Sequence, residues 1–134
     1  SSVPDQLMGD AAAIDGRFPL LVKLLDARED LSVQVHPPQA WVDDHPGHHV
    51  KTESWVVVDA APGARLYLGL EPDTTRERFE AALGTPALVD LLRSVPARAG
   101  DVFHLEPGVV HALGAGVLRI VDGGIRRESA PTRG

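Results

Sequence analysis

Short apolar segments separated by glycine or proline run through almost the whole sequence. The 134 residues include 13 Gly and 11 Pro, and turn signals such as Ala61-Pro62-Gly63 and Glu106-Pro107-Gly108 lie between the segments. Glycine and proline end regular elements because glycine adopts turn conformations freely and proline lacks a backbone donor. This punctuation is typical of an all-β sandwich or barrel. It predicts strands over residues 19–26, 32–36, 54–60, 64–70, 101–105, 109–113 and 117–121.

One stretch departs from the β pattern. Thr74-x-x-Glu77 has the spacing of a capping box, and apolar residues follow it at helical intervals as far as Leu83. Gly84-Thr85-Pro86 then suits the end of one helix and the start of another. We therefore predict a two-helix insertion, over about 74–83 and 86–94, in a mainly β fold.

The length of the chain is that of one ordinary domain, so we predict a single domain over residues 1–134. Residues 1–15 and 123–134 carry no periodic pattern, and we expect them to be loosely ordered.

Composition excludes several classes of partner. The longest apolar runs, 18–22 and 55–58, are far shorter than the ~20 residues of a membrane-spanning helix. A formal charge of −6 does not suit a binder of duplex nucleic acid, which needs a basic face. The chain has no cysteine, which fits a reducing compartment, and Ser1–Asp10 does not read as a signal peptide. We expect a cytoplasmic protein without a membrane or nucleic-acid partner.

Several potential metal ligands are spaced two residues apart or follow a turn. Gln34 and His36 share one strand face, Lys51 and Glu53 repeat that spacing, and His111 follows the turn at Pro107-Gly108. Imidazole with carboxylate suits Zn²⁺, Fe²⁺, Mn²⁺ or Ni²⁺. A single strand histidine is commonly a surface or hydrogen-bonded core residue, so this spacing alone leaves both interpretations open.

Longer motifs make the interpretation more specific. They are Phe18-Pro19-Leu20-Leu21-Val22-Lys23, Asp30-Leu31-Ser32-Val33-Gln34-Val35-His36-Pro37, Lys51-Thr52-Glu53, and Gly100-Asp101-Val102-Phe103 followed by Val110-His111-Ala112. In this order, and over roughly residues 16–120, they resemble the type I phosphomannose isomerases.

The resemblance implies a cupin (jelly-roll) β-barrel and a zinc-dependent enzyme that interconverts mannose 6-phosphate and fructose 6-phosphate. By the family pattern, Gln34, His36, Glu53 and His111 would be the ligands of one zinc ion. Ser32 and Lys51 match positions that line the sugar-phosphate pocket. The implied partner is therefore a small sugar phosphate, and a homodimer is one alternative for the oligomeric state.

The family reaction transfers a proton between C1 and C2 of an open-chain sugar. It needs an acid/base group and stabilisation of the charge that grows on O1 and O2. Lys51 is the candidate catalytic residue for one of these roles. The family also carries a catalytic arginine in a Ser-Asp-x-Thr-Tyr-Arg stretch, and no residue here matches it, since the sequence after Val117 reads differently.

Two other functions therefore remain alternatives. One is a non-catalytic cupin that binds metal and phosphosugar. The other is an Fe(II) oxygenase that uses His36, Glu53 and His111 as a two-His-one-carboxylate triad. Gln34 argues against the oxygenase if it binds the metal, because it would fill a position that dioxygen or substrate needs.

Overall fold

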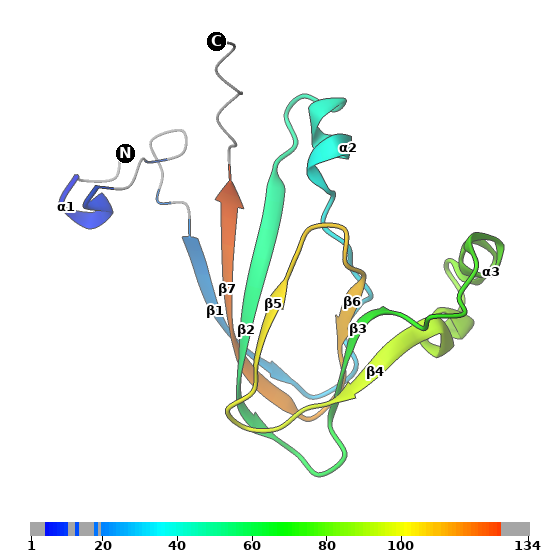
Figure 1. The fold of residues 1–134 in the computed structure, drawn as a ribbon. Coiled ribbons are helices and arrows are strands. Elements are labelled where there is room, and N and C mark those ends of the chain that lie inside the picture. The colour runs from blue at the N-terminus through cyan, green and yellow to red at the C-terminus, as the bar shows by residue number, and fades with distance from the viewer. Residues whose placement is uncertain (1–4, 11–12, 14–17, 19, 127–134) are drawn as a thin grey trace.

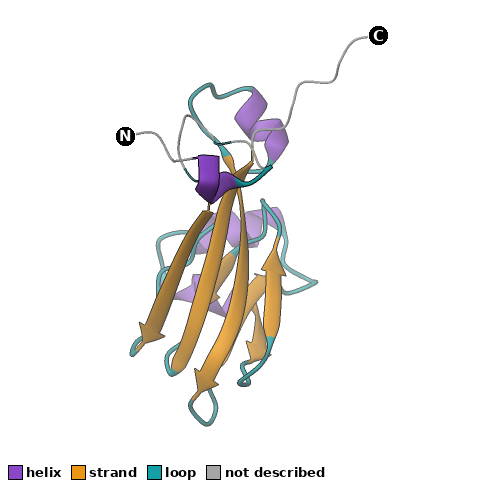
Figure 2. Ribbon diagram, turned by 90° about the vertical axis from the view of Figure 1, so that its left-hand side faces the viewer, coloured by secondary structure: helices purple, strands orange, loops and turns teal. Residues whose placement is uncertain are grey.

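The computed structural model describes residues 5–10, 13, 18 and 20–126 as two antiparallel sheets that face each other, with few short helices (Figures 1 and 2). The first sheet has the strand order β1-β7-β2-β5 and the second β4-β3-β6. The strands of the first sheet are β1 (Leu20–Ala27), β7 (Val117–Arg126), β2 (Val50–Ala60) and β5 (Val102–Leu105). Those of the second are β4 (Leu92–Pro96), β3 (Arg65–Leu70) and β6 (His111–Leu113). The predicted mainly β class is confirmed.

The hydrophobic core lies between the two sheets. In β2, Trp55 and Val57 are buried whereas Val56 and Val58 are exposed, because successive side chains of a strand point to opposite faces. Leu66 of β3 and Val117 of β7 are fully buried. Both sheets therefore contribute to one core, and the inward face of β2 continues from this core toward Glu53.

The helical insertion is present with changed boundaries. α3 (Arg76–Ala82) begins after Thr75, whose side chain accepts a hydrogen bond from the Arg78 amide, so the cap is Thr75 rather than the predicted Thr74. Gly84 follows the helix with φ of +74°, a conformation that glycine adopts without strain.

The second predicted helix was too long. Residues Pro86–Leu91 form a short 3₁₀ helix, η1, and Leu92–Pro96 form β4, which pairs with β3. The spacing of the apolar residues fits both a helix and a strand. Pairing with the neighbouring strand β3 favours the strand, and a local sequence pattern does not reveal such pairing.

The predicted strand over 32–36 is not a regular strand. Only Gln34 forms a bridge, with His111, although backbone hydrogen bonds also join Leu31 to Leu113 and Gly108 to His36. Pro37 and Pro38 follow and have no amide donor to extend the pairing. A short helix, α2 (Gln39–Asp43), comes next and was not predicted.

Both chain ends differ in part from the expectation. β7 pairs with β1 as far as Gly124 and with β2 as far as Arg126, so residues 123–126 form a strand where loose order was expected. Residues 127–134 lie outside the described part. Near the start, Asp5–Met8 form α1, whereas residues 1–4, 11–12 and 14–15 lie outside it. Among the described helices, none is long and apolar enough to cross a membrane.

Candidate metal and ligand site

β2 directs Lys51, Glu53 and Trp55 to one face of the first sheet, toward the second sheet. The three residues alternate along the strand, so their side chains share a face. Glu53 and Trp55 are buried, and Lys51, the second residue of β2, is half-buried. A carboxylate is thus held at the margin of the apolar core.

Every polar neighbour of Glu53 favours its ionised form. Lys51 Nζ donates to Oε1, and Trp55 Nε1 donates to Oε2 over 2.9 Å. His36 Nε2 lies 3.1 Å from Oε1. Burial would raise the pKa of Glu53, but the hydrogen bonds from Lys51 and Trp55 and the charges of Lys51 and His36 outweigh it and lower the pKa to about 2. Glu53 is therefore a carboxylate at neutral pH, which metal binding requires.

His111 presents an unpaired ring nitrogen to the same place. Its Nδ1 lies 2.9 Å from the carbonyl oxygen of Val109, to which only a protonated nitrogen can donate, so Nε2 carries the lone pair. Nε2 is buried and has no hydrogen-bond partner among the described residues. Burial lowers the pKa of His111, which keeps the ring neutral. A neutral imidazole whose second nitrogen is fixed by a carbonyl is the usual form of a metal-binding histidine.

His36 completes a three-residue group. One ligand atom from each of His36, Glu53 and His111 lies within 4.8 Å of the others, and the two imidazole centroids are 5.1 Å apart. The donor set, two imidazoles and one carboxylate, suits a divalent transition metal. These residues fit such an ion, and they come from the segment before α2, from β2 and from β6 in the opposite sheet.

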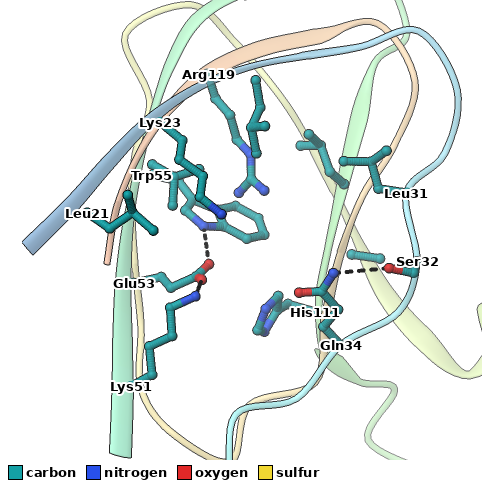
Figure 3. Close-up of a pocket in the computed structure, with 14 residues that line it drawn as sticks. Leu21, Lys23, Leu31, Ser32, Gln34, Lys51, Glu53, Trp55, His111 and Arg119 are labelled. Carbon is teal, nitrogen blue, oxygen red and sulfur yellow. Dashed lines mark hydrogen bonds and ion pairs between the residues drawn. The ribbon is translucent and has the colours of Figure 1, made fainter. Parts of the chain in front are cut away.

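Gln34 and Ser32 lie next to this group. The bridge between the Gln34 and His111 backbones fixes the position of Gln34, and its side-chain Nε2 donates to Ser32 Oγ over 3.0 Å. Figure 3 shows the Gln34 amide oxygen turned away from Ser32, on the side of His111. The structure therefore brings all the predicted metal and substrate residues to one region, while their individual roles stay predictions.

A pocket that is partly open to solvent lies beside the metal group. Ser32, Gln34, Lys51, Glu53 and His111 line it. Figure 3 also shows two further cationic side chains pointing into it. These are Lys23 of β1 and Arg119 of β7, and Arg119 is buried.

Sequence reasoning did not identify Lys23 or Arg119 as pocket residues. Arg119 lies between Val117 and Val121 on the inward face of β7, so a charged residue on an otherwise apolar strand face was the available signal. Trp55 packs in the core and also donates a hydrogen bond to Glu53.

Comparison with known proteins agrees with the resemblance seen in the sequence. Residues 3–57 match the family model described as phosphomannose isomerase type I, catalytic domain. A mannose-6-phosphate isomerase of Streptococcus mutans is 41% identical over 101 residues, which are 75% of this chain and 32% of that protein. One of Bacillus subtilis is 40% identical over 116 residues, 86% of this chain and 35% of that protein.

The fold agrees as well. A crystal structure of the mannose 6-phosphate isomerase from Bacillus subtilis superposes with a TM-score of 0.75 at 28% identity, covering 90% of this chain and 38% of that one. This confirms the predicted cupin type of fold. The chain spans about a third of the length of the curated relatives that it matches. Together, the matched segment, the identities of about 40% and the shared fold show that this chain is similar, over the part of its relatives that it spans, to the type I phosphomannose isomerases.

Proposed function

We propose that this chain forms the metal and sugar-phosphate site of an isomerase that interconverts mannose 6-phosphate and fructose 6-phosphate, with zinc as the metal. The observation that carries the proposal is the buried, unpaired Nε2 of His111 beside the carboxylate of Glu53 and the ring of His36. If His111 served only to pack the core, its buried Nε2 would lack a hydrogen-bond partner and would destabilise the fold. A bound metal ion would give that nitrogen a partner. The names of the relatives at about 40% identity supply the substrate class.

The chemistry follows from the groups around the pocket. Isomerisation moves a proton between C1 and C2 through an enediol and develops negative charge on O1 and O2. A bound divalent ion supplies Lewis-acid stabilisation for such oxygens. The Lys51 ammonium is held at the pocket wall by its ion pair with Glu53, where it can donate a proton to a developing oxyanion. Its role as the catalytic residue is part of the proposal.

Ser32 and Gln34 are proposed to orient the ligand and the metal. The Ser32 hydroxyl accepts from the Gln34 amide, which leaves the hydroxyl hydrogen free to donate to a substrate oxygen. The same hydrogen bond orients the Gln34 carbonyl oxygen, a neutral fourth ligand beside the two histidines and Glu53.

The test measures metal content and turnover on one sample. We expect about one zinc per chain by elemental analysis, and conversion of mannose 6-phosphate that is lost with a chelator and restored by zinc. Turnover is expected to be slow, because no residue matches the family arginine. Protein that holds metal but neither converts nor binds either sugar phosphate would refute the proposal.

Two results would instead support the alternatives. Binding of both sugar phosphates without any conversion indicates a non-catalytic binding module. Oxygen consumption by the iron-loaded protein, without isomerisation, indicates an oxygenase site made of His36, Glu53 and His111.

A further inference from the structure

The Arg119 guanidinium is buried in the pocket without a complete set of partners. Arg119 is 6% exposed, and its Nε and Nη1 have no hydrogen-bond partner among the described residues. Its guanidinium carbon lies 3.4 Å from the centroid of the Trp55 ring. Stacking on an aromatic face stabilises a cation, but it leaves the N–H donors of the guanidinium unpaired. Buried donors without acceptors are costly, so this site lacks an acceptor.

Glu53 is not that acceptor. Its Oε1 already accepts a hydrogen bond from Lys51 Nζ and lies 3.1 Å from His36 Nε2. Its Oε2 accepts a hydrogen bond from Trp55 Nε1. No hydrogen bond or ion pair joins Arg119 to Glu53 in the described structure. Burial lowers the pKa of Arg119 to about 10, against the opposing effect of Glu53, so the side chain is still a cation at neutral pH.

Lys23 lies diagonally across the sheet from Arg119. Lys23 pairs with Val121 and Leu25 pairs with Arg119 in the β1–β7 register. Diagonal neighbours in an antiparallel pair are roughly 7–8 Å apart, within reach of long side chains. Figure 3 shows both side chains directed into the pocket on the side of Trp55 away from Lys51.

The charge of the pocket has the opposite sign to that of the chain. The charged side chains that line it are the cations Lys23, Lys51 and Arg119 and the single carboxylate Glu53. The chain as a whole carries a formal charge of −6. A cationic, partly buried cavity in an acidic protein attracts and selects an anion.

We infer that Arg119, held on the face of Trp55, and Lys23 form an anion-binding subsite that takes the phosphate of a phosphate monoester. A phosphate offers three acceptor oxygens, which match the parallel donors of a guanidinium and the ammonium group of a lysine. The inference concerns the same pocket as the proposed function and rests on it for the sugar, but the affinity for phosphate stands on Arg119 and Lys23 alone.

The test uses inorganic phosphate as the probe and Trp55 as the reporter. Trp41 of α2 is partly exposed and outside the pocket, so Trp41→Phe leaves Trp55 as the single tryptophan. Phosphate is titrated into this protein at constant ionic strength, with chloride as the reference anion. We expect a saturable change in Trp55 fluorescence with phosphate and none with chloride. The absence of a saturable change would overturn the inference.

Variants then assign the binding to the subsite. In the same background, Arg119→Met is expected to raise the Kd for phosphate about tenfold or more, the usual effect of losing a charge-assisted hydrogen bond. Arg76→Met removes the same charge from the exposed face of α3 and should leave the Kd unchanged. An unchanged Kd in Arg119→Met would overturn the inference, because phosphate would then bind elsewhere, for example at the metal.

A second pair of variants protects the test against misfolding. Lys23 is exposed, so Lys23→Met should fold, and we expect it to weaken phosphate binding severalfold. Arg119→Lys keeps the cation but not the parallel donors, so its affinity should lie between those of wild type and Arg119→Met. If neither Lys23→Met nor Arg119→Lys changes the Kd for phosphate, the proposed subsite is wrong.

The outcomes also distinguish this inference from the proposed function. Phosphate binding without isomerisation would refute the proposed function alone. Isomerisation with an unchanged Kd for phosphate in these variants would refute the subsite alone.

Discussion

Trp55 Nε1 donates a hydrogen bond to Glu53 Oε2 over 2.9 Å, and both residues are buried. The bond links the packed core between the two sheets to the carboxylate of the candidate metal site. Because the indole is held by its packing, it can fix the orientation of the carboxylate as an outer partner of a metal ligand does. The stability of the core and the geometry of the site are therefore coupled at this pair.

This coupling predicts that Trp55→Phe weakens metal binding. Phenylalanine keeps an aromatic ring in the core but removes the N–H donor. We expect zinc affinity to fall by about 10–100-fold, the usual effect of losing an outer-shell partner, as measured by competition with a chromogenic chelator. Trp41→Phe, in partly exposed α2, is the matched control and should bind zinc as the wild type does. Equal affinities in the two variants would show that the bond does not position Glu53.

Removal of the metal should lower the melting temperature. The candidate ligands belong to two sheets and a connecting segment, so an ion that binds only the native state stabilises the whole fold. Free zinc at 100 times its Kd would add about 2.7 kcal/mol. His111→Ala is expected to abolish most of the difference between melting curves with and without chelator. His104→Ala, at an exposed histidine of β5, should preserve it. Identical curves for wild type, on protein that holds metal, would contradict a bridging site.

The metal-free protein should lose stability in acid through Glu53. The folded-state pKa of Glu53 is lowered to about 2 from an ordinary value of 4.5. Below pH 4.5 the unfolded chain therefore binds a proton that the native state does not, and the stabilisation present above pH 4.5 is lost progressively toward pH 2. Urea unfolding in chelator at pH 5.5 and pH 3 checks this. Wild type should lose more unfolding free energy over that interval than Glu53→Gln, which has no carboxylate to titrate. Equal losses would show that Glu53 does not titrate as its contacts imply.

Substitution of Lys51 separates catalysis from binding. If turnover is observed, Lys51→Ala should lower kcat much more than it raises KM, because the proposed donation to an oxyanion strengthens in the transition state. Steady-state kinetics with mannose 6-phosphate measures both constants. Lys51→Arg, which keeps a cation beside Glu53, is the companion variant and should restore binding but not the full kcat. A rise in KM alone in Lys51→Ala would make Lys51 a phosphate anchor and remove its catalytic assignment.

Much of the fold was predictable, because the signals that specify it are local. Turn residues and period-two apolar segments predicted most strands of both sheets, and the capping pattern located both ends of α3 within two residues. The failures share a cause. Residues 92–94 were predicted as the end of a helix, and 32–36 as a strand. The local pattern at each place fits two states, and pairing with β3 or β6 decides between them.

The sequence alone determined that Lys51 and Glu53 share a face, since a strand places every second residue on one side. Only the tertiary structure decided that β6 lies across the core from β2, which brings His111 to Glu53, and that Arg119 stacks on Trp55. Alternation is a property of the backbone within one strand. The approach of side chains from different sheets depends on how the buried residues pack and on hydrogen bonds between segments far apart in the chain, and no local pattern encodes these.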